Sequence, residues 1–275
     1  MTYKSLLCHV QPDADHAEHV RCAASLSDDL NAMVIGLGAA AIPPLAVSAG
    51  GAYAGLDGEW LALMGDQIRL NLAGSQKVFE EAIGARSHEW RTQWLEPTPA
   101  LAQAARSADL IIVRHGGPGR PIPYSDVEVG QLVVSAGRPV LICPPGRDYL
   151  GKGPVLVAWK DSRESRRAVT DALPLLQRSE DVLIVEVSQD ADTSPAAARL
   201  EEVTAALARH GVRARGEVLE PAGRADEAIM TRAGQLGAEL IVAGGYGHTR
   251  RGEWAFGGVT RSLLEQERYF ILLSH

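Results

Sequence analysis

The sequence predicts an α/β protein made of two similar units, each with a parallel sheet covered by helices. Short continuous runs of valine, isoleucine and leucine alternate with amphipathic stretches along the 275 residues. Strands that lack in-and-out alternation are typical of parallel sheets covered on both faces. Their alternation with helical patterns indicates βαβ units. The second observation is an internal repeat, in which the later half of the chain copies the earlier half.

Helical patterns separate these apolar runs. Residues 162–177 begin with Ser162, a residue type that caps helix N-termini. Residues 195–210 begin with Pro195, which suits the first turn of a helix. A third pattern covers 259–267. The predicted strands lie at 5–10, 33–39, 110–113, 139–143, 154–159, 181–187, 239–244 and 270–274.

The repeat gives the domain organisation. Segment 108–113 matches 238–243 with an offset of 130 (238 − 108), whereas the first strands, at Leu6 and Val155, match with an offset of 149 (155 − 6). The first half therefore carries 19 extra residues (149 − 130), which we place within 40–75 because glycines break the pattern there. We expect one domain over 1–149 and a second over 150–275.

Composition excludes several classes of protein. Lys and Arg number 27 against 34 Asp and Glu, a net charge of −7, which argues against nucleic-acid binding. No apolar run approaches the ~20 residues that a membrane span needs, and the N-terminus does not resemble a signal peptide. Three widely spaced cysteines indicate buried thiols rather than disulfides or a zinc site. We expect a cytoplasmic protein.

A glycine motif follows the strand at 239–244. Gly244 and Gly247 are separated by two residues, and nine more lead to Gly257, after which the third helical pattern begins. Glycines allow consecutive N–H groups to face one anion, and a helix N-terminus adds its positive dipole end. Thr260 adds a hydroxyl. A strand-to-helix turn with no ligand explains the same glycines, and this spacing matches neither a Walker P-loop nor a dinucleotide fingerprint.

The motif resembles that of the universal stress protein family. The sequence AELIVAGGYG, followed nine residues after Gly247 by GGVT, has the family's pattern, and the likeness extends over both halves. The resemblance implies two tandem doubly wound (Rossmann-like) units, each with a five-stranded sheet of order 3-2-1-4-5. It also implies a pseudo-dimer in which the strands at 139–143 and 270–274 meet edge to edge.

Some members of this family bind ATP, so the resemblance implies an adenine-nucleotide site in the second half, with Mg²⁺ as the companion of ATP. Two residues depart from the family pattern: Lys160 stands at the usual acidic position, and Gly258 stands where serine or threonine is usual. His248 is included as a phosphate candidate because it follows the second glycine, although it is equally consistent with an exposed loop. The predicted contacts are Trp159, Lys160, Asp161, Val187, Gly244, Gly247, His248, Gly257, Gly258, Val259 and Thr260.

The first half resembles a degenerate copy. The offset of 130 places Arg114, Gly117, Val127 and Glu128 at the glycine positions, so a carboxylate stands where a phosphate is expected.

No residues are predicted to be catalytic or to bind a metal. A metal cluster of Asp13, Asp15, His16 and His19 is the weaker alternative to a solvated first helical turn.

These observations predict a stress-response protein that binds adenine nucleotide, ATP in particular, and acts as a sensor or interaction module. The alternatives are an interaction or structural protein without nucleotide, and a slow ATPase. We expect protein partners and a homodimer, and neither nucleic acid nor membrane as a partner.

Overall fold

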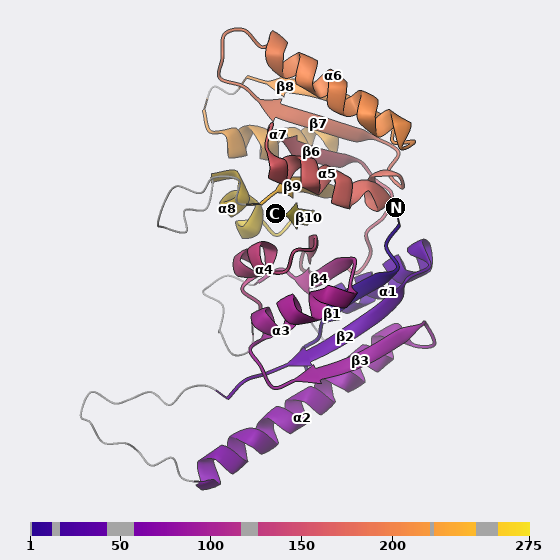
Figure 1. The fold of residues 1–275 in the computed structure, drawn as a ribbon, viewed down its shortest axis with the longest axis vertical. Helices are drawn as coiled ribbons and strands as arrows, with labels where there is room; N and C mark the ends of the chain where they lie inside the picture. The colour runs from indigo at the N-terminus through magenta and orange to yellow at the C-terminus, as the bar shows by residue number, and fades with distance from the viewer. Residues whose placement is uncertain (1, 13–16, 43–57, 117–125, 221–222, 246–257) are drawn as a thin grey trace, which may run out of the picture.

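A single ten-stranded sheet runs through the molecule, with helices on both faces (Figure 1). The computed structural model describes residues 2–12, 17–42, 58–116, 126–220, 223–245 and 258–275. Its strand order is β3-β2-β1-β4-β5-β10-β9-β6-β7-β8. Each half therefore has the predicted order 3-2-1-4-5, and the α/β tandem fold is confirmed. The domain boundary between 149 and 150 stays a prediction.

We call the elements up to β5 the first unit and those from β6 onward the second unit. The first unit comprises β1 Ser5–His9, α1 Glu18–Leu30, β2 Met33–Ala39, α2 Gly58–Ile83, β3 His88–Gln93, α3 Pro97–Ala104, a 3-10 turn Ala105–Ser107, β4 Leu110–Arg114, α4 Val129–Ser135 and β5 Val140–Cys143. The second comprises β6 Val155–Trp159, α5 Arg163–Leu176, β7 Val182–Val187, α6 Ser194–Arg209, β8 Ala214–Leu219, α7 Ala225–Leu236, β9 Leu240–Gly244, α8 Gly258–Glu265 and β10 Phe270–Ser274.

All eight predicted strands are present, with ends shifted by a residue or so. Ser162 caps α5 as predicted, since its Oγ accepts a hydrogen bond from the Ser165 N–H at 3.3 Å. The two strands that the sequence did not reveal are β3 and β8, which form the two edges of the sheet. Most of their side chains are exposed or half-buried, so they lack the continuous apolar run that marked the others.

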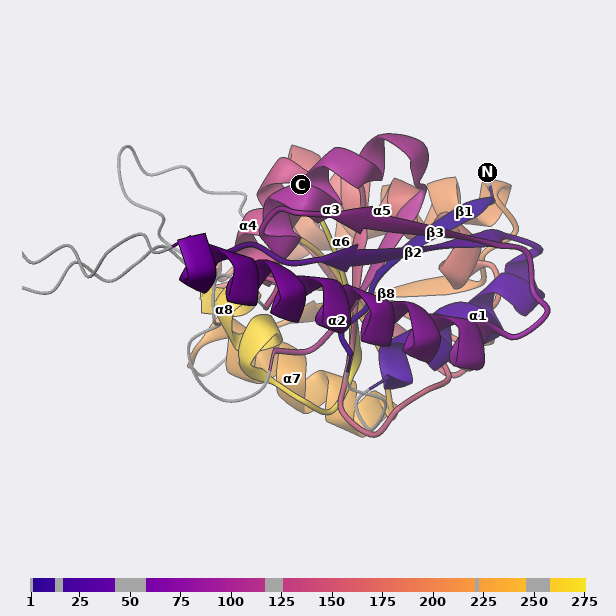
Figure 2. The same cartoon turned by 90° about the horizontal axis from the view of Figure 1, so that it is seen from below.

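The extra residues of the first unit lie between β2 and β3, a connection that contains the predicted interval 40–75 and extends beyond it. Helix α2 has 26 residues, whereas its counterpart α6 has 16. Residues 43–57, which precede α2, lie outside the described residues. Figure 2 shows α2 along the β2–β3 edge, on the same side as α1.

The two units join through their last strands, as the family resemblance predicted. β5 and β10 pair antiparallel, with Ile142 opposite Ile271 and Val140 opposite Leu273. Each unit thereby covers the free edge of the other, which removes two strand edges prone to aggregation. A carbonyl–imidazole contact also crosses the junction, since His115 Nε2 lies 2.8 Å from the Leu264 oxygen and donates to it.

Two apolar layers flank the sheet. Helices α1, α2, α5 and α6 pack on one face, and α3, α4, α7 and α8 pack on the other. All three cysteines are free and buried, as predicted. Burial raises the pKa of the Cys8 thiol, which keeps it protonated at neutral pH. None of the helices in the described part of the chain combines the length and apolarity needed to span a membrane.

In each unit, a carboxylate at the same position of the repeat binds the segment that precedes the unit's first strand. Glu239, at the start of β9, accepts backbone N–H bonds from Gly151 at 2.9 Å and Gly153 at 3.0 Å, and pairs with Arg147. Asp109, 130 residues earlier, accepts from the Lys4 and Ser5 N–H groups at 2.8 and 3.0 Å. Each carboxylate therefore fixes the segment that leads into the central strand of its own unit.

Replacing Glu239 with alanine should lower the free energy of unfolding by about 2–3 kcal/mol, because two backbone N–H groups lose a charged acceptor. Glu265→Ala is the matched control, since Glu265 is 62% exposed and its ion pair among the described residues is with Arg261 along α8. We expect a change within about 0.5 kcal/mol for it. Urea unfolding of the two variants measures the difference, and equal midpoints would refute the role of Glu239.

Candidate functional site

The candidate site lies at the carboxyl edge of the second unit, where the strand order reverses. β6 pairs with β7 on one side and with β9 on the other. The crossover from β6 to β7 runs through α5 on one face, and that from β8 to β9 runs through α7 on the opposite face. Open α/β sheets bind ligands in the crevice that forms at such a reversal.

The end of β6 supplies three of the predicted residues. Trp159, the last residue of the strand, is buried, and its indole Nε1 has no hydrogen-bond partner among the described residues. Lys160 is exposed, and its backbone N–H donates to Ser165 Oγ at 3.3 Å. Asp161 is also exposed and pairs with Arg166 at 2.6 Å. Its carboxylate is thus already engaged by an arginine of α5.

Val187 ends β7 beside this turn. Trp159 pairs in register with Glu186, so Val187 follows directly on the neighbouring strand. Both carboxylate oxygens of Glu186 are bonded by Arg199 from α6. The backbone at Val187 therefore lies on the strand next to the Lys160 turn, beside an ion pair that the sequence did not reveal.

Gly244 closes the other side of the site. It ends β9, and Ala243 beside it pairs with Ala158 of β6. A Cβ atom at Gly244 would lie 2.7 Å from both the Glu164 carbonyl carbon and the Ser165 nitrogen. The N-terminus of α5 therefore packs directly on this glycine, so backbone packing alone requires glycine here.

The start of α8 is the described remainder of the glycine motif. Gly258 is exposed at the first position of the helix, Val259 is half-buried and Thr260 is buried. Arg224 Nη2 lies 3.8 Å from the position that a Cβ on Gly258 would occupy. Predicted contacts Gly247, His248 and Gly257 lie outside the described residues. Of the other eight, Trp159, Lys160, Asp161, Val187 and Gly244 end or follow three strands paired side by side, β7, β6 and β9, and Gly258, Val259 and Thr260 begin α8.

Arginine–carboxylate pairs surround this edge. Arg163 pairs with Glu164, Arg166 with Asp161, Arg199 with Glu186, and Arg224 with Asp226. The Arg224 guanidinium holds the pKa of the Asp226 carboxyl well below its usual range, and the Ser262 hydroxyl assists. The site thus offers guanidinium donors whose charges are already compensated. No sequence motif indicated Arg224, because it lies between α7 and β8, a strand that the sequence did not reveal.

The corresponding edge of the first unit is built differently. Glu128 caps α4, with its carboxylate accepting the Gln131 N–H at 2.9 Å. Arg114 and Val127 are half-buried, and Gly117 lies outside the described residues. A carboxylate thus already occupies one of the N–H groups at the start of α4 that a phosphate would need.

The alternative metal cluster has only one described member. His19 is buried in α1, with its Nε2 bonded to the His9 carbonyl at 2.7 Å, while Asp13, Asp15 and His16 lie outside the described residues. Within the described ranges, no three His, Cys, Asp or Glu side chains are grouped to hold a metal ion.

Comparison with known proteins identifies the architecture. A universal stress protein from Archaeoglobus fulgidus DSM 4304 matches with a TM-score of 0.72 at 15% identity, over 98% of this chain and 95% of that one. A functionally unknown protein from Pseudomonas aeruginosa PAO1 matches with a TM-score of 0.63 at 17% identity, over 99% and 92%. Neither the protein-family models nor the curated proteins gave a match. The chain therefore has the fold of a universal stress protein in its two-unit form.

Proposed function

We propose that this chain is a tandem universal stress protein that binds one adenine nucleotide, ATP, at the carboxyl edge of its second unit. The observation that carries the proposal is the contrast between the two units. In the second unit, Gly258 opens α8, whose described first turn contains no acidic residue, and Arg224 lies beside it, paired with Asp226. In the first unit, Glu128 occupies that place.

We assign a part to each segment of the site. The turn at Lys160 and the backbone at Val187 lie on adjacent strands, where the adenosine of the family's nucleotide would sit. The start of α8, at Gly258 and Thr260, would meet the phosphates, and Mg²⁺ would arrive with ATP. Because no catalytic set is evident among the described residues, we propose a sensor or interaction module. Homodimerisation and protein partners stay predictions.

Titration calorimetry with ATP should give one site per chain. Gly247→Val should abolish binding, because the side chain would block approach of the phosphates, whereas Gly117→Val in the first unit should leave affinity unchanged. Arg224→Met should weaken binding about tenfold or more, since a charged donor beside α8 is lost.

Arg209→Met is the matched control for Arg224, because Arg209 is an exposed arginine at the end of α6, away from the site. Two sites per chain, or loss of binding in folded Gly117→Val with retention in Gly247→Val, would contradict the assignment. Absence of ATP binding in the intact protein would favour the alternative, an interaction protein without nucleotide. Two features agree with that alternative: Lys160 stands at the usual acidic position, and packing against α5 is sufficient to explain Gly244.

A further inference from the structure

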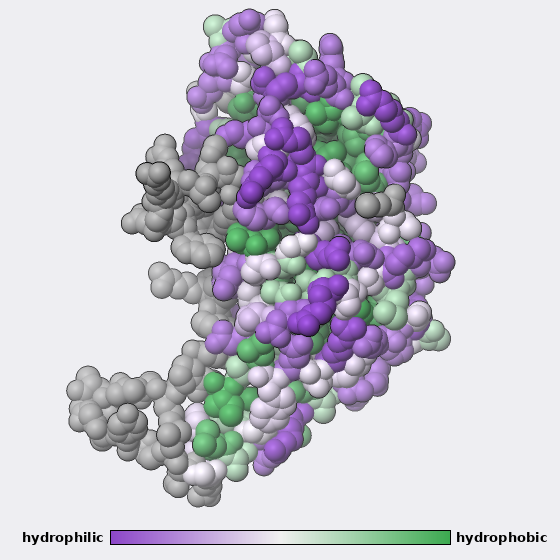
Figure 3. Space-filling view, viewed as in Figure 1, coloured by the Kyte–Doolittle hydropathy of each residue, from purple (hydrophilic) through white to green (hydrophobic). Residues whose placement is uncertain are grey.

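Both described ends of the glycine motif contact the first unit. The motif leaves the described residues at Gly245 and returns at Gly258, the start of α8. A Cβ atom at Gly245 would lie 2.8 Å from Val133 Cγ1 of α4. At the other end, the Leu264 carbonyl of α8 accepts a hydrogen bond from His115 Nε2 at 2.8 Å. Hydrophobic surface lies between α4 and α8 (Figure 3), so the junction of the units is also a wall of the motif.

The backbone and the tautomer of His115 make it a fixed donor. His115 follows β4, its backbone N–H donates to the Cys143 carbonyl of β5 at 2.8 Å, and it is 7% exposed. Because Nε2 faces a carbonyl oxygen, that nitrogen carries the proton. Nδ1 has no hydrogen-bond partner in the described part of the chain and lies 3.9 Å from the Glu267 carboxylate.

The Leu264 carbonyl needs a donor from outside its helix. The last carbonyls of a helix have no N–H partner within it. Leu264 lies in the last turn of α8, and the N–H four residues later, that of Arg268, donates to Gln266 Oε1 at 2.8 Å. His115 therefore supplies a donor that α8 and the residues after it do not.

Helix α8 is short, so contacts with its surroundings set its position. It has eight residues and is about 12 Å long. A helix of two turns is not stable by itself and depends on tertiary packing. Leu263 is buried and the Ser262 hydroxyl bonds a carboxylate of α7, whereas His115 anchors the end opposite Gly258. Because so short a helix moves as one body, a shift at Leu264 also displaces the N–H groups at its start.

The repeat does not return this contact. The offset of 130 relates His115 to Gly245 (115 + 130) and Leu264 to Val134 (264 − 130). Glycine has no side chain, so the second unit offers α4 no side-chain donor from that position. The support runs one way, from the unit whose glycine positions are replaced to the unit that keeps them.

We propose that His115 is a positioning residue, through which the first unit holds α8 and so sets the affinity of the second unit for the phosphates of ATP. The inference rests on the proposed function. It gives the degenerate unit a part in binding at a site to which it contributes no ligand contact.

Two variants of His115 test the hydrogen bond. His115→Leu removes the donor with a side chain of similar volume, whereas His115→Gln keeps one, since the same number of bonds separates Nε2 from Cα in both residues. Without nucleotide, the amides of α8 should exchange their hydrogens about fivefold faster in His115→Leu, and those of α7 should not change. ATP affinity, measured by titration calorimetry, should fall about fivefold. His115→Gln should restore both quantities to within about twofold.

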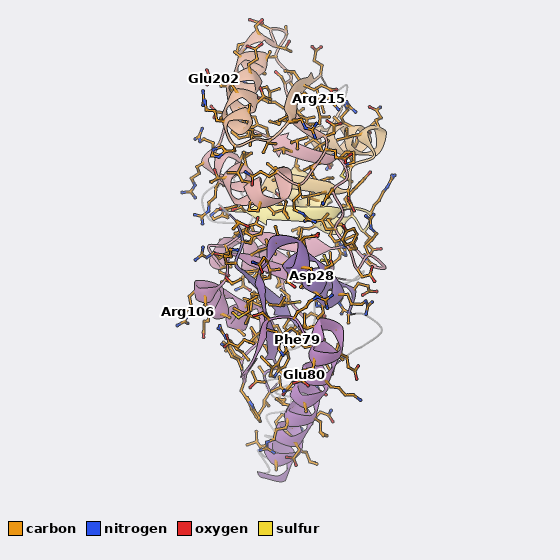
Figure 4. All side chains as sticks on the ribbon, turned by 90° about the vertical axis from the view of Figure 1, so that its right-hand side faces the viewer. Asp28, Phe79, Glu80, Arg106, Glu202 and Arg215 are labelled. Atoms are coloured by element: carbon orange, nitrogen blue, oxygen red, sulfur yellow. The ribbon has the colours of Figure 1, made fainter. Side chains whose placement is uncertain are left out.

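Asp29→Ala is the matched control, because Asp29 of α1 pairs across the junction with Arg178, which follows α5. This pair lies on the face of the sheet opposite α8, and Figure 4 shows α1 beside the junction at the labelled residue Asp28. The control should lower the free energy of unfolding but leave α8 exchange and ATP affinity unchanged. A general weakening of the junction is thereby separated from loss of the His115 contact.

Unchanged exchange of α8 in His115→Leu, an equal effect of Asp29→Ala, or failure of His115→Gln to restore the intact behaviour would overturn the inference. So would unchanged ATP affinity in a His115→Leu protein whose α8 exchanges faster. If the intact protein does not bind ATP, the proposed function fails, and the exchange of α8 still decides whether His115 holds the helix.

Discussion

Gly244→Ala should lower the free energy of unfolding by about 3 kcal/mol, the upper range for an overpacked core. The added methyl group would lie 2.7 Å from two backbone atoms of α5, at Glu164 and Ser165. Backbone atoms cannot rotate away as a side chain can, so α5 or β9 must shift. Denaturant unfolding measures the loss.

Gly258→Ala provides the comparison within the same motif. A Cβ there would meet nothing closer than Arg224 Nη2 at 3.8 Å, and the residue is exposed at the first position of α8. We expect a change within about 0.5 kcal/mol. A Gly244→Ala protein as stable as Gly258→Ala would show that α5 does not rest on β9 as described.

This contrast shows why glycine spacing is an ambiguous signal for a ligand. Gly244 and Gly258 both belong to the pattern from which the sequence predicted a phosphate site. The structure gives Gly244 a packing reason that holds with or without a ligand, and gives Gly258 none. Of the described glycines in the motif, Gly258 is therefore the more informative about binding.

The fold was largely predictable from the sequence because its central strands are buried on both faces. Strands such as β1, β6 and β9 are continuous apolar runs, and their repetition revealed the tandem organisation. The edge strands β3 and β8 were missed since one side of each faces solvent and their residues are mixed. Antiparallel pairing of β5 with β10 was predictable only through the family resemblance.

The candidate site was predictable only in part. Residues at strand ends, such as Lys160 and Val187, follow from the strand pattern, because the carboxyl ends of parallel strands meet at one edge. Arg199 and Arg224 could not be identified, since each lies far along the chain from the motif and arginine has no distinctive spacing. The unpaired indole of Trp159 depends on side-chain packing between α5, α6 and the sheet, which no local pattern encodes.

Two buried histidines in the first unit should make the protein sensitive to mild acid. His9 ends β1 and His19 lies in α1, and they are 5% and 4% exposed. Burial, with a smaller contribution from the neighbouring Arg114, lowers the pKa of His9 to about 3 and that of His19 to about 4. His9 Nε2 and His19 Nδ1 have no partner among the described residues, so protonation would leave a buried charged donor unpaired.

The sign follows from proton linkage. Above the ordinary histidine pKa of about 6.5, neither the folded nor the unfolded chain binds the proton, and these residues cause no loss. Below it the unfolded chain takes up protons that the folded chain excludes, so stability falls as the pH drops toward the folded values. Each histidine should remove about 1.4 kcal/mol per pH unit, or about 4 kcal/mol for the pair at pH 5. Asp226, whose pKa is lowered from 3.8, contributes only at lower pH.

The double variant His9→Asn, His19→Gln should flatten this profile between pH 6.5 and 5. The glutamine amide at position 19 can still donate to the backbone carbonyl of residue 9, as the Nε2 of His19 does. The asparagine amide at position 9 can donate to the Ala39 backbone in place of the His9 ring. Neither amide titrates. The double variant will be less stable than the intact protein at pH 7.5, because an amide fills less space than an imidazole, but its unfolding free energy should change little on acidification.

The control is His210→Gln, at an exposed position, which should retain the full dependence of stability on pH. Urea unfolding at half-unit pH steps gives the three profiles, and parallel slopes in all three would show that other groups cause the acid sensitivity.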